Sequence, residues 1–184
     1  MLTFILGGAR SGKSRFAQSL CGTAPRVASL ATALPQDEEM RARIARHRLD
    51  RPPAWTTFEE PLEISRLVDQ QASSFDMILL DCLTLWLSNW CWEYRNQTIE
   101  QLEASVASEI ERLSQASLKV RLTAVSNEVG CGIVPGSSIA RQFRDLQGMV
   151  NQRVASAAQT VYQMVAGIPV LIKSSEIPVV RFPK

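Results

Sequence analysis

The sequence predicts an α/β fold: a doubly wound, mostly parallel sheet with helices on both of its faces. Short apolar segments bounded by turn residues alternate along the chain with longer segments whose apolar residues repeat at helical spacing. This alternation is typical of strand–helix–strand units, in which each helix crosses over to the next parallel strand. The first apolar segment also ends at two glycines, which open a glycine-containing turn of the kind found after the first strand of such sheets.

Each expected strand is a short run of apolar or β-branched residues, as parallel strands buried on both faces require. The run at 75–80 leads directly into Asp81, which places a carboxylate at the end of a buried strand. The last two runs are expected to close the sheet. In chain order, the expected strands cover residues 3–6, 27–30, 75–80, 119–125, 161–165 and 170–172.

The expected helices lie between these strands. Residues 37–49 begin with acidic and end with basic side chains, which matches the helix dipole, and two prolines follow shortly after. Met40, Ile44 and His47 fall on one face of that helix. The other expected helices cover residues 14–20, 61–71 and 83–92, and two amphipathic patterns follow at 99–113 and 139–154.

Length and composition limit the class of protein. A chain of 184 residues with 46% hydrophobic residues fits one domain over residues 1–184, with 174–184 expected to be a C-terminal extension. Lys and Arg number 20 and Asp and Glu 18, for a net charge of +2. This balance argues against a chain built mainly to coat nucleic acid, so no nucleic-acid partner is expected.

The cysteines and the apolar segments bear on the cellular compartment of the protein. The four cysteines form no C-x-x-C pair and there is one histidine, which argues against a zinc site and for a reducing compartment. No secretory signal is visible, and the longest apolar stretch, 77–92, is interrupted by polar residues and is shorter than a membrane span. We therefore expect a cytoplasmic protein without stable membrane insertion.

Residues 7–14 carry the most informative motif, because they fit G-x-x-x-x-G-K-[ST] in full, with an apolar strand before and a helix after. Such a loop turns backbone N–H groups inward around phosphate oxygens, and the helix N-terminus adds a favourable field. Lys13 is expected to reach the β- and γ-phosphates and Ser14 to ligate Mg²⁺. This predicts a P-loop NTPase-type fold; the alternative is a glycine-rich turn that binds nothing. The motif residues are Gly7, Gly8, Ala9, Arg10, Ser11, Gly12, Lys13 and Ser14.

Asp81 is the carboxylate that such a nucleotide site needs to hold Mg²⁺, directly or through water. The alternative is a helix cap, since Thr84 and Leu85 follow it closely. The sequence has no N-K-x-D tetrapeptide, which argues against a Ras-like GTPase switch. A small-molecule kinase or a nucleotidyltransferase fits better.

His47, the only histidine, has two interpretations. Its position on an apolar helix face is typical of a packed core histidine. Its neighbours Arg43, Arg46, Arg48 and Arg51 would instead make an anion site, in which a neutral imidazole could act as a nucleophile. The residue pattern alone leaves both interpretations open.

Two further segments are ambiguous. Asn127 and Glu128 follow the expected fourth strand, at the edge where open α/β sheets bind ligands, but the glycines after them could serve only a turn. Trp86, Trp90 and Trp92 lie close together and could form core, the wall of a flat ligand site, or a subunit contact.

Together these residues resemble one family, the bifunctional adenosylcobinamide kinase / adenosylcobinamide-phosphate guanylyltransferases of cobalamin biosynthesis. The resemblance covers residues 4–173. The P-loop is shared with many unrelated proteins, whereas the His47 segment and the loop at 127–135 are far more specific. The marks are residues 7–14, Ala31-Thr32-Ala33, Arg43-Ile44, His47, Arg51-Pro52, Trp55, Thr57, Glu59, 81–84, 127–135, Ala140-Arg141, 143–145, Gly148 and Val150-Asn151-Gln152.

The resemblance implies two reactions at overlapping sites. GTP or ATP first phosphorylates the aminopropanol hydroxyl of adenosylcobinamide, and a histidine then accepts GMP from GTP and passes it to adenosylcobinamide phosphate. In this chain that histidine would be His47, with Lys13 as the second catalytic residue and Mg²⁺ held by Ser14 and Asp81. A homotrimer is also implied. The implied nucleotide contacts are residues 7–14 together with Ala31, Thr32, Ala33, Arg48, Leu49, Asp50, Arg51, Glu59 and Asp81.

Two other functions compete with this hypothesis. A monofunctional P-loop kinase for another small molecule would leave His47 with a structural role only. A non-catalytic nucleotide-binding regulator would bind GTP or ATP without turnover on any corrinoid.

Overall fold

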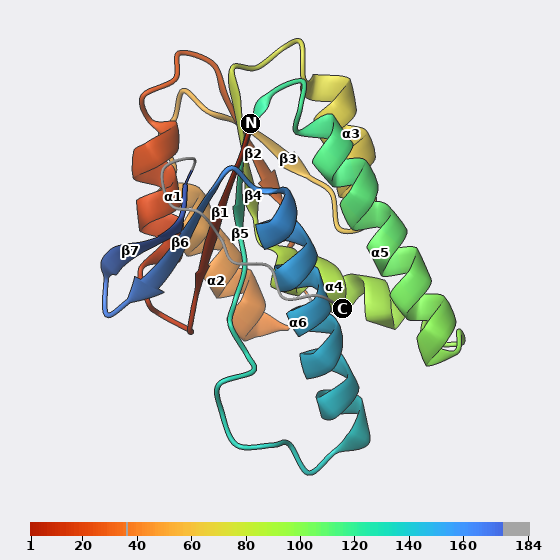
Figure 1. Ribbon diagram of the computed structural model, residues 1–184. Helices are drawn as coiled ribbons and strands as arrows, with labels where there is room; N and C mark the ends of the chain where they lie inside the picture. The colour runs from red at the N-terminus through yellow and green to blue at the C-terminus, as the bar shows by residue number, and fades with distance from the viewer. Residues whose placement is uncertain (36, 175–184) are drawn as a thin grey trace.

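One mixed sheet organises the part of the chain that the computed structural model describes, residues 1–35 and 37–174. Its strands run in the order β3-β2-β4-β5-β1-β6-β7 (Figure 1). All neighbouring pairs are parallel except β6 and β7, which form an antiparallel hairpin. The strands are β1 (Leu2–Gly7), β2 (Val27–Ala31), β3 (Thr56–Glu59), β4 (Met77–Asp81), β5 (Arg121–Val125), β6 (Thr160–Val165) and β7 (Ile168–Lys173).

Helices cover both faces of the sheet, as the sequence predicts (Figure 1). One apolar layer lies under α1, and a larger one lies under α3, α4, α5 and α6 on the opposite face. The central strands are buried on both sides, which is why β4 is apolar throughout from Met77 to Leu80. The helices are α1 (Lys13–Cys21), α2 (Glu38–Leu49), α3 (Ile64–Gln71), α4 (Leu83–Glu93), α5 (Ile99–Ala116) and α6 (Ser138–Ala157).

Local sequence signals fix the ends of several helices. Asp37 caps α2 by accepting a hydrogen bond from Met40 N at 2.7 Å. A capping box joins Thr98 and Gln101 at the start of α5. No helix among residues 1–35 and 37–174 is both long enough and apolar enough to cross a membrane.

Two element predictions need correction. Strand β3 was not predicted, because it is only four residues long, mostly exposed and at the sheet edge, so Thr56–Glu59 carries little apolar pattern. Helix α3 begins at Ile64 rather than at 61, because Glu60 accepts hydrogen bonds from Leu62 N and Glu63 N and holds that stretch in a turn. The predicted extension at 174–184 lies, apart from Ser174, outside the described residues.

Trp86 and Trp90 belong to the core, with indole rings 5.3 Å apart and exposures of 0% and 6%. Each indole N–H has a partner, Leu62 O for Trp86 and Ser105 Oγ for Trp90. Trp92 is exposed, with the Arg95 guanidinium over its ring. The core interpretation therefore holds for two of the three tryptophans.

Candidate nucleotide site

The loop after β1 has the backbone geometry of a phosphate cradle. Gly7 and Gly12 both have positive φ, and a Cβ on Gly7 would lie 2.7 Å from Ser11 Oγ and 2.8 Å from Met164 O. Gly12 is the N-cap of α1, so the loop runs directly into the helix N-terminus. The positions at which the motif demands glycine are thus positions at which a side chain would clash or strain the backbone.

Lys13 is buried at the start of α1, with 8% exposure. Its Nζ donates hydrogen bonds to Gly8 O at 2.5 Å and to Ser11 Oγ at 3.4 Å, so the ammonium group lies within the curve of the loop. The turn between β6 and β7 supports the loop from outside, since Gly167 N donates to Ser11 O at 3.1 Å. The cradle is therefore held by hydrogen bonds from a buried lysine and from the β6–β7 turn.

The carboxyl ends of β2 and β4 are tied together beside this loop. Thr32 Oγ1 donates to Cys82 O at 2.7 Å and accepts from Cys82 N at 3.0 Å. Asn89 on α4 donates to Thr32 O at 2.7 Å. These bonds hold Asp81 close to residues 31–33 at the carboxyl edge of the sheet. Both were predicted as nucleotide contacts.

The pKa of Cys82 reflects charges both at the end of β4 and in the phosphate loop. Burial raises the pKa of the Cys82 thiol to about 11, with the charge of Asp81 acting in the same direction. The Lys13 ammonium acts against this rise in pKa, so its charge is felt at the end of β4. The N-cap residue of α4 is Cys82 and no side chain caps that helix, so the alternative of Asp81 as a helix cap finds no support.

Helix α2 brings its basic end to the same edge of the sheet. Arg48 forms an ion pair with Glu59 at the end of β3. Burial lowers the pKa of Arg51, while the charges of Asp81 and Glu59 favour its protonated form and that of Arg48 opposes it. Arg48, Arg51, Glu59 and Asp81 therefore form one charged cluster.

His47 lies on α2, within one turn of that cluster. Met40, Ile44 and His47 are all half-buried, so the face they share is partly open and His47 is not a core residue. The structure does not bring Leu49 and Asp50 into the cluster. Leu49 is 86% exposed, and Asp50 is exposed as the C-cap of α2.

The segment after β5 completes this edge. Ser126 and Asn127 take part in a buried hydrogen-bond network with Thr84 on α4 and with Gln147 and Asn151 on α6. The sequence singled out Asn127, and Asn151 among the family marks, but not their connection. Because the partners lie 20 or more residues apart and each is an ordinary helix or loop residue, no spacing rule would have found them.

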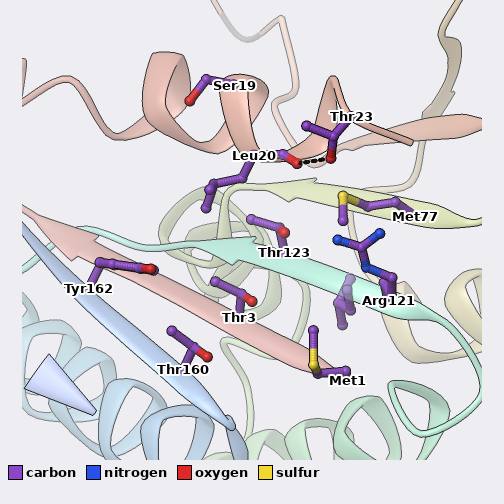
Figure 2. Close-up of a pocket in the computed structure, with 11 residues that line it drawn as sticks. Met1, Thr3, Ser19, Leu20, Thr23, Met77, Arg121, Thr123, Thr160 and Tyr162 are labelled. Atoms are coloured by element: carbon purple, nitrogen blue, oxygen red, sulfur yellow. Dashed lines mark hydrogen bonds between the residues drawn. The ribbon is translucent and has the colours of Figure 1, made fainter. Parts of the chain in front are cut away.

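A hollow of about 260 Å³ lies elsewhere, between α1 and the amino ends of β1, β4, β5 and β6 (Figure 2). Met1, Thr3, Arg121 and Thr160 line it. Open parallel sheets bind their ligands outside the carboxyl ends of the strands. We therefore place the nucleotide site at the phosphate loop and not in this hollow.

The parallel sheet, the glycine loop with its buried lysine and the charged carboxyl edge define a P-loop α/β protein. A solved structure, reported as a prototypical ATPase from the type III secretion system of pathogenic bacteria, has a similar fold. Its TM-score is 0.57 at 11% identity, and the match covers 88% of this chain and 50% of that one.

The chain belongs to the cobinamide kinase / cobinamide phosphate guanyltransferase family, whose model matches residues 3–172. It is 39% identical to the bifunctional adenosylcobalamin biosynthesis protein CobU of Escherichia coli and 40% identical to that of Salmonella typhimurium. It is 38% identical to CobP of Pseudomonas aeruginosa. Each match covers the whole relative and 94% to 96% of this chain. The family resemblance seen in the sequence is confirmed.

Proposed function

We propose that this chain phosphorylates the aminopropanol hydroxyl of adenosylcobinamide and then transfers GMP from GTP to the new phosphate, giving adenosylcobinamide-GDP. The observation that carries the proposal is the family match over nearly the whole chain, combined with a buried P-loop lysine. His47 lies beside a charged cluster at the same edge of the sheet, which supports the second reaction.

In the kinase step, the loop N–H groups and Lys13 hold the β- and γ-phosphates of GTP or ATP. The substrate oxygen bonds to the γ-phosphorus as the bond between that phosphorus and the β–γ bridging oxygen breaks. Because this transition state spreads charge over the phosphoryl oxygens, positioning and positive charge supply most of the catalysis. Lys13 is already buried within the loop, so little reorganisation is required.

The residues present fit a magnesium ion. Mg²⁺ prefers oxygen ligands and keeps several of its waters and phosphate oxygens. The Ser14 hydroxyl and the Asp81 carboxylate offer such oxygens, and no side-chain hydrogen bond engages Asp81 among the described residues. When bound, Mg²⁺ neutralises charge on the phosphate oxygens.

In the guanylyl step, a ring nitrogen of His47 bonds to the α-phosphorus of GTP, and pyrophosphate leaves. A phosphate oxygen of adenosylcobinamide phosphate then bonds to the same phosphorus as the nitrogen–phosphorus bond breaks. The phosphoramidate keeps the transfer potential of the triphosphate, so one difficult substitution becomes two easier ones. Arg48 and Arg51 supply positive charge near His47 for the anionic substrates.

The remaining predictions belong to this proposal. They are nucleotide contacts by residues 7–14, 31–33, 48–51, Glu59 and Asp81, a single domain with an extension at 174–184, a cytoplasmic location and a homotrimer. Leu49 and Asp50 have the weakest support among the contacts, because among residues 1–35 and 37–174 no side-chain hydrogen bond or ion pair joins either of them to the charged cluster.

A product analysis tests the proposed function. The purified protein is incubated with adenosylcobinamide, Mg²⁺, and GTP or ATP. The corrinoid products are then separated and identified by mass spectrometry. The proposal predicts adenosylcobinamide phosphate and, with GTP present, adenosylcobinamide-GDP and pyrophosphate. Adenosylcobinamide phosphate alone would indicate a kinase without the guanylyl step. Nucleotide binding with no corrinoid product would indicate a kinase for another small molecule or the regulator.

A further inference from the structure

Glu128 lies at the centre of the carboxyl edge of the sheet. It follows β5, and β5 lies between β4, which ends in Asp81, and β1, which ends in the phosphate loop. The loop at 127–135 was noted in the sequence, yet neither of the two proposed reactions uses it so far. Glu128 places a further carboxylate at this edge, beside the phosphate loop, in addition to Asp81 and to Glu59 and Glu60 at the end of β3.

The backbone around Glu128 is fixed more firmly than is usual for a loop. Ser126 N donates to Ile5 O at 3.0 Å, and Glu128 N donates to Gly7 O at 3.1 Å, so the segment is bonded to β1 up to the first glycine of the phosphate loop. Asn127 N donates to Thr84 Oγ1 at 2.8 Å. Three consecutive N–H groups are therefore occupied.

Helix α6 holds the same segment from behind. Asn151 Nδ2 donates to Asn127 O at 3.1 Å, while its Oδ1 accepts from Ser126 Oγ at 2.8 Å. Gln147, fully buried, donates to both Ser126 Oγ and Asn151 Oδ1 at 3.0 Å. Gln147 Oε1 is buried without a hydrogen-bond partner among residues 1–35 and 37–174, but the other bonds of this network favour one geometry, because each bonded polar group would lose free energy if displaced.

The carboxylate of Glu128 is anchored by one oxygen only. Oε1 accepts a hydrogen bond from Gly130 N at 2.6 Å. Oε2 has no hydrogen-bond partner among residues 1–35 and 37–174, and the side chain is half-buried. One oxygen thus orients the group, and the other is able to accept a proton from a substrate.

We propose that Glu128 is the general base of the kinase step. As the substrate hydroxyl oxygen bonds to the γ-phosphorus, its proton passes to Glu128 Oε2, and the nucleoside diphosphate leaves with the electrons of the broken phosphorus–oxygen bond. Other carboxylates at this edge are engaged: Glu59 is ion-paired with Arg48, Glu60 accepts hydrogen bonds from Leu62 N and Glu63 N, and Asp81 is the proposed metal group. The assignment rests on the proposed function.

The chemistry confines this role to one of the two reactions. An alcohol must lose a proton when it becomes a phosphate ester. A phosphate monoester has a second pKa of about 6, so near neutral pH its attacking oxygen carries no proton in most molecules. Neither the guanylylation of His47 nor the transfer of GMP to adenosylcobinamide phosphate therefore needs Glu128.

The test compares Glu128→Gln with wild type in the kinase step and in the two guanylyl steps, using adenosylcobinamide phosphate prepared beforehand for the last. We expect the kinase kcat to fall about 10²- to 10⁴-fold with little change in KM. Both guanylyl steps should keep wild-type rates, and so should the kinase activity of the exposed control Glu103→Gln.

Other outcomes overturn the assignment. Near-normal kinase turnover in Glu128→Gln, or an equal loss of kinase and guanylyl activity, would mean that Glu128 is not the base. Either result leaves the proposed function intact. Wild-type protein that makes no adenosylcobinamide phosphate would instead overturn the proposed function, and the assignment with it.

Asn151 provides a second, positioning test. Asn151→Ser removes the amide that donates to Asn127 O and accepts from Ser126 Oγ and Gln147 Nε2, without adding bulk. The kinase kcat should fall about tenfold or more, as expected when several hydrogen bonds that hold this segment are lost, while guanylylation of His47 is retained. Equal losses in both reactions would show that Asn151 serves only the fold.

Discussion

The phosphate loop and helix α2 carry the two proposed reactions, and the chain holds them in place by different means. The loop sits between β1 and α1, with Lys13 buried and Ser11 O bonded to Gly167 N. None of the described side chains of α2 is fully buried. Asp37 caps its first turn from within the same segment, and the exposed Arg48–Glu59 ion pair joins it to β3.

The difference follows from what each region binds. A phosphate cradle works through backbone N–H groups, which stay in place only when the surrounding core fixes them. A nucleophile that must first accept and then release GMP gains from a helix with few buried contacts, because such helices shift at low cost. An exposed ion pair contributes about 0–1 kcal/mol, so the placement of α2 is weakly specified.

The largest effect is expected where both reactions depend on one group. Lys13→Ala removes the buried ammonium that holds the triphosphate, so kinase turnover and His47 guanylylation should each fall by about 10²-fold or more. Steady-state kinetics and adduct formation measure the two losses. Lys119→Ala, which removes a surface lysine paired with Asp69, should leave both unchanged. Near-normal kinase turnover in Lys13→Ala would contradict the proposed cradle.

The next effect concerns the proposed metal group. Asp81→Asn keeps the shape of the side chain but removes its charge, so the Mg²⁺ concentration for half-maximal phosphoryl transfer should rise about 10- to 100-fold. A magnesium titration of kinase rate checks this. Asp69→Asn is the control, since Asp69 lies on α3 and pairs with Lys119. An unchanged titration for Asp81→Asn would remove Asp81 from the metal site.

The smallest effect distinguishes the two regions most clearly. Asp37→Ala removes the N-cap of α2, at a cost of about 1 kcal/mol to that helix. Guanylylation of His47 should slow a few-fold while kinase turnover stays constant, because the phosphate loop does not depend on α2. Asp37→Asn, which can still cap, should restore the guanylylation rate. A parallel loss of both activities would mean that the two regions are held as one unit.

Much of this arrangement could be predicted from the sequence. The apolar runs gave the buried strands, and the phosphate loop was recognisable because its chemistry requires glycine, lysine and serine at fixed spacing. Strand β3 could not be predicted, since its pairing with β2 rather than its own pattern makes it a strand. The Arg48–Glu59 pair and the network around Asn151 also depend on tertiary contacts between distant segments.

His47 shows the limit of local patterns. Its helix face suggested a core histidine as readily as a nucleophile, and the residues alone did not decide. In the structure, the face of α2 that carries Met40, Ile44 and His47 is half-buried, and it lies beside the charged cluster. That placement favours an accessible imidazole.

The most direct test of the two-region account is the intact mass of the protein after incubation with GTP and Mg²⁺ alone. Wild type should gain the mass of one covalent GMP, through a bond that is labile in acid and stable in base, as a phosphoramidate is. His47→Asn should gain none while retaining appreciable kinase activity, because γ-phosphoryl transfer relies on the loop and not on the imidazole. An undiminished adduct on His47→Asn, or active transfer by wild type with no adduct, would contradict the account.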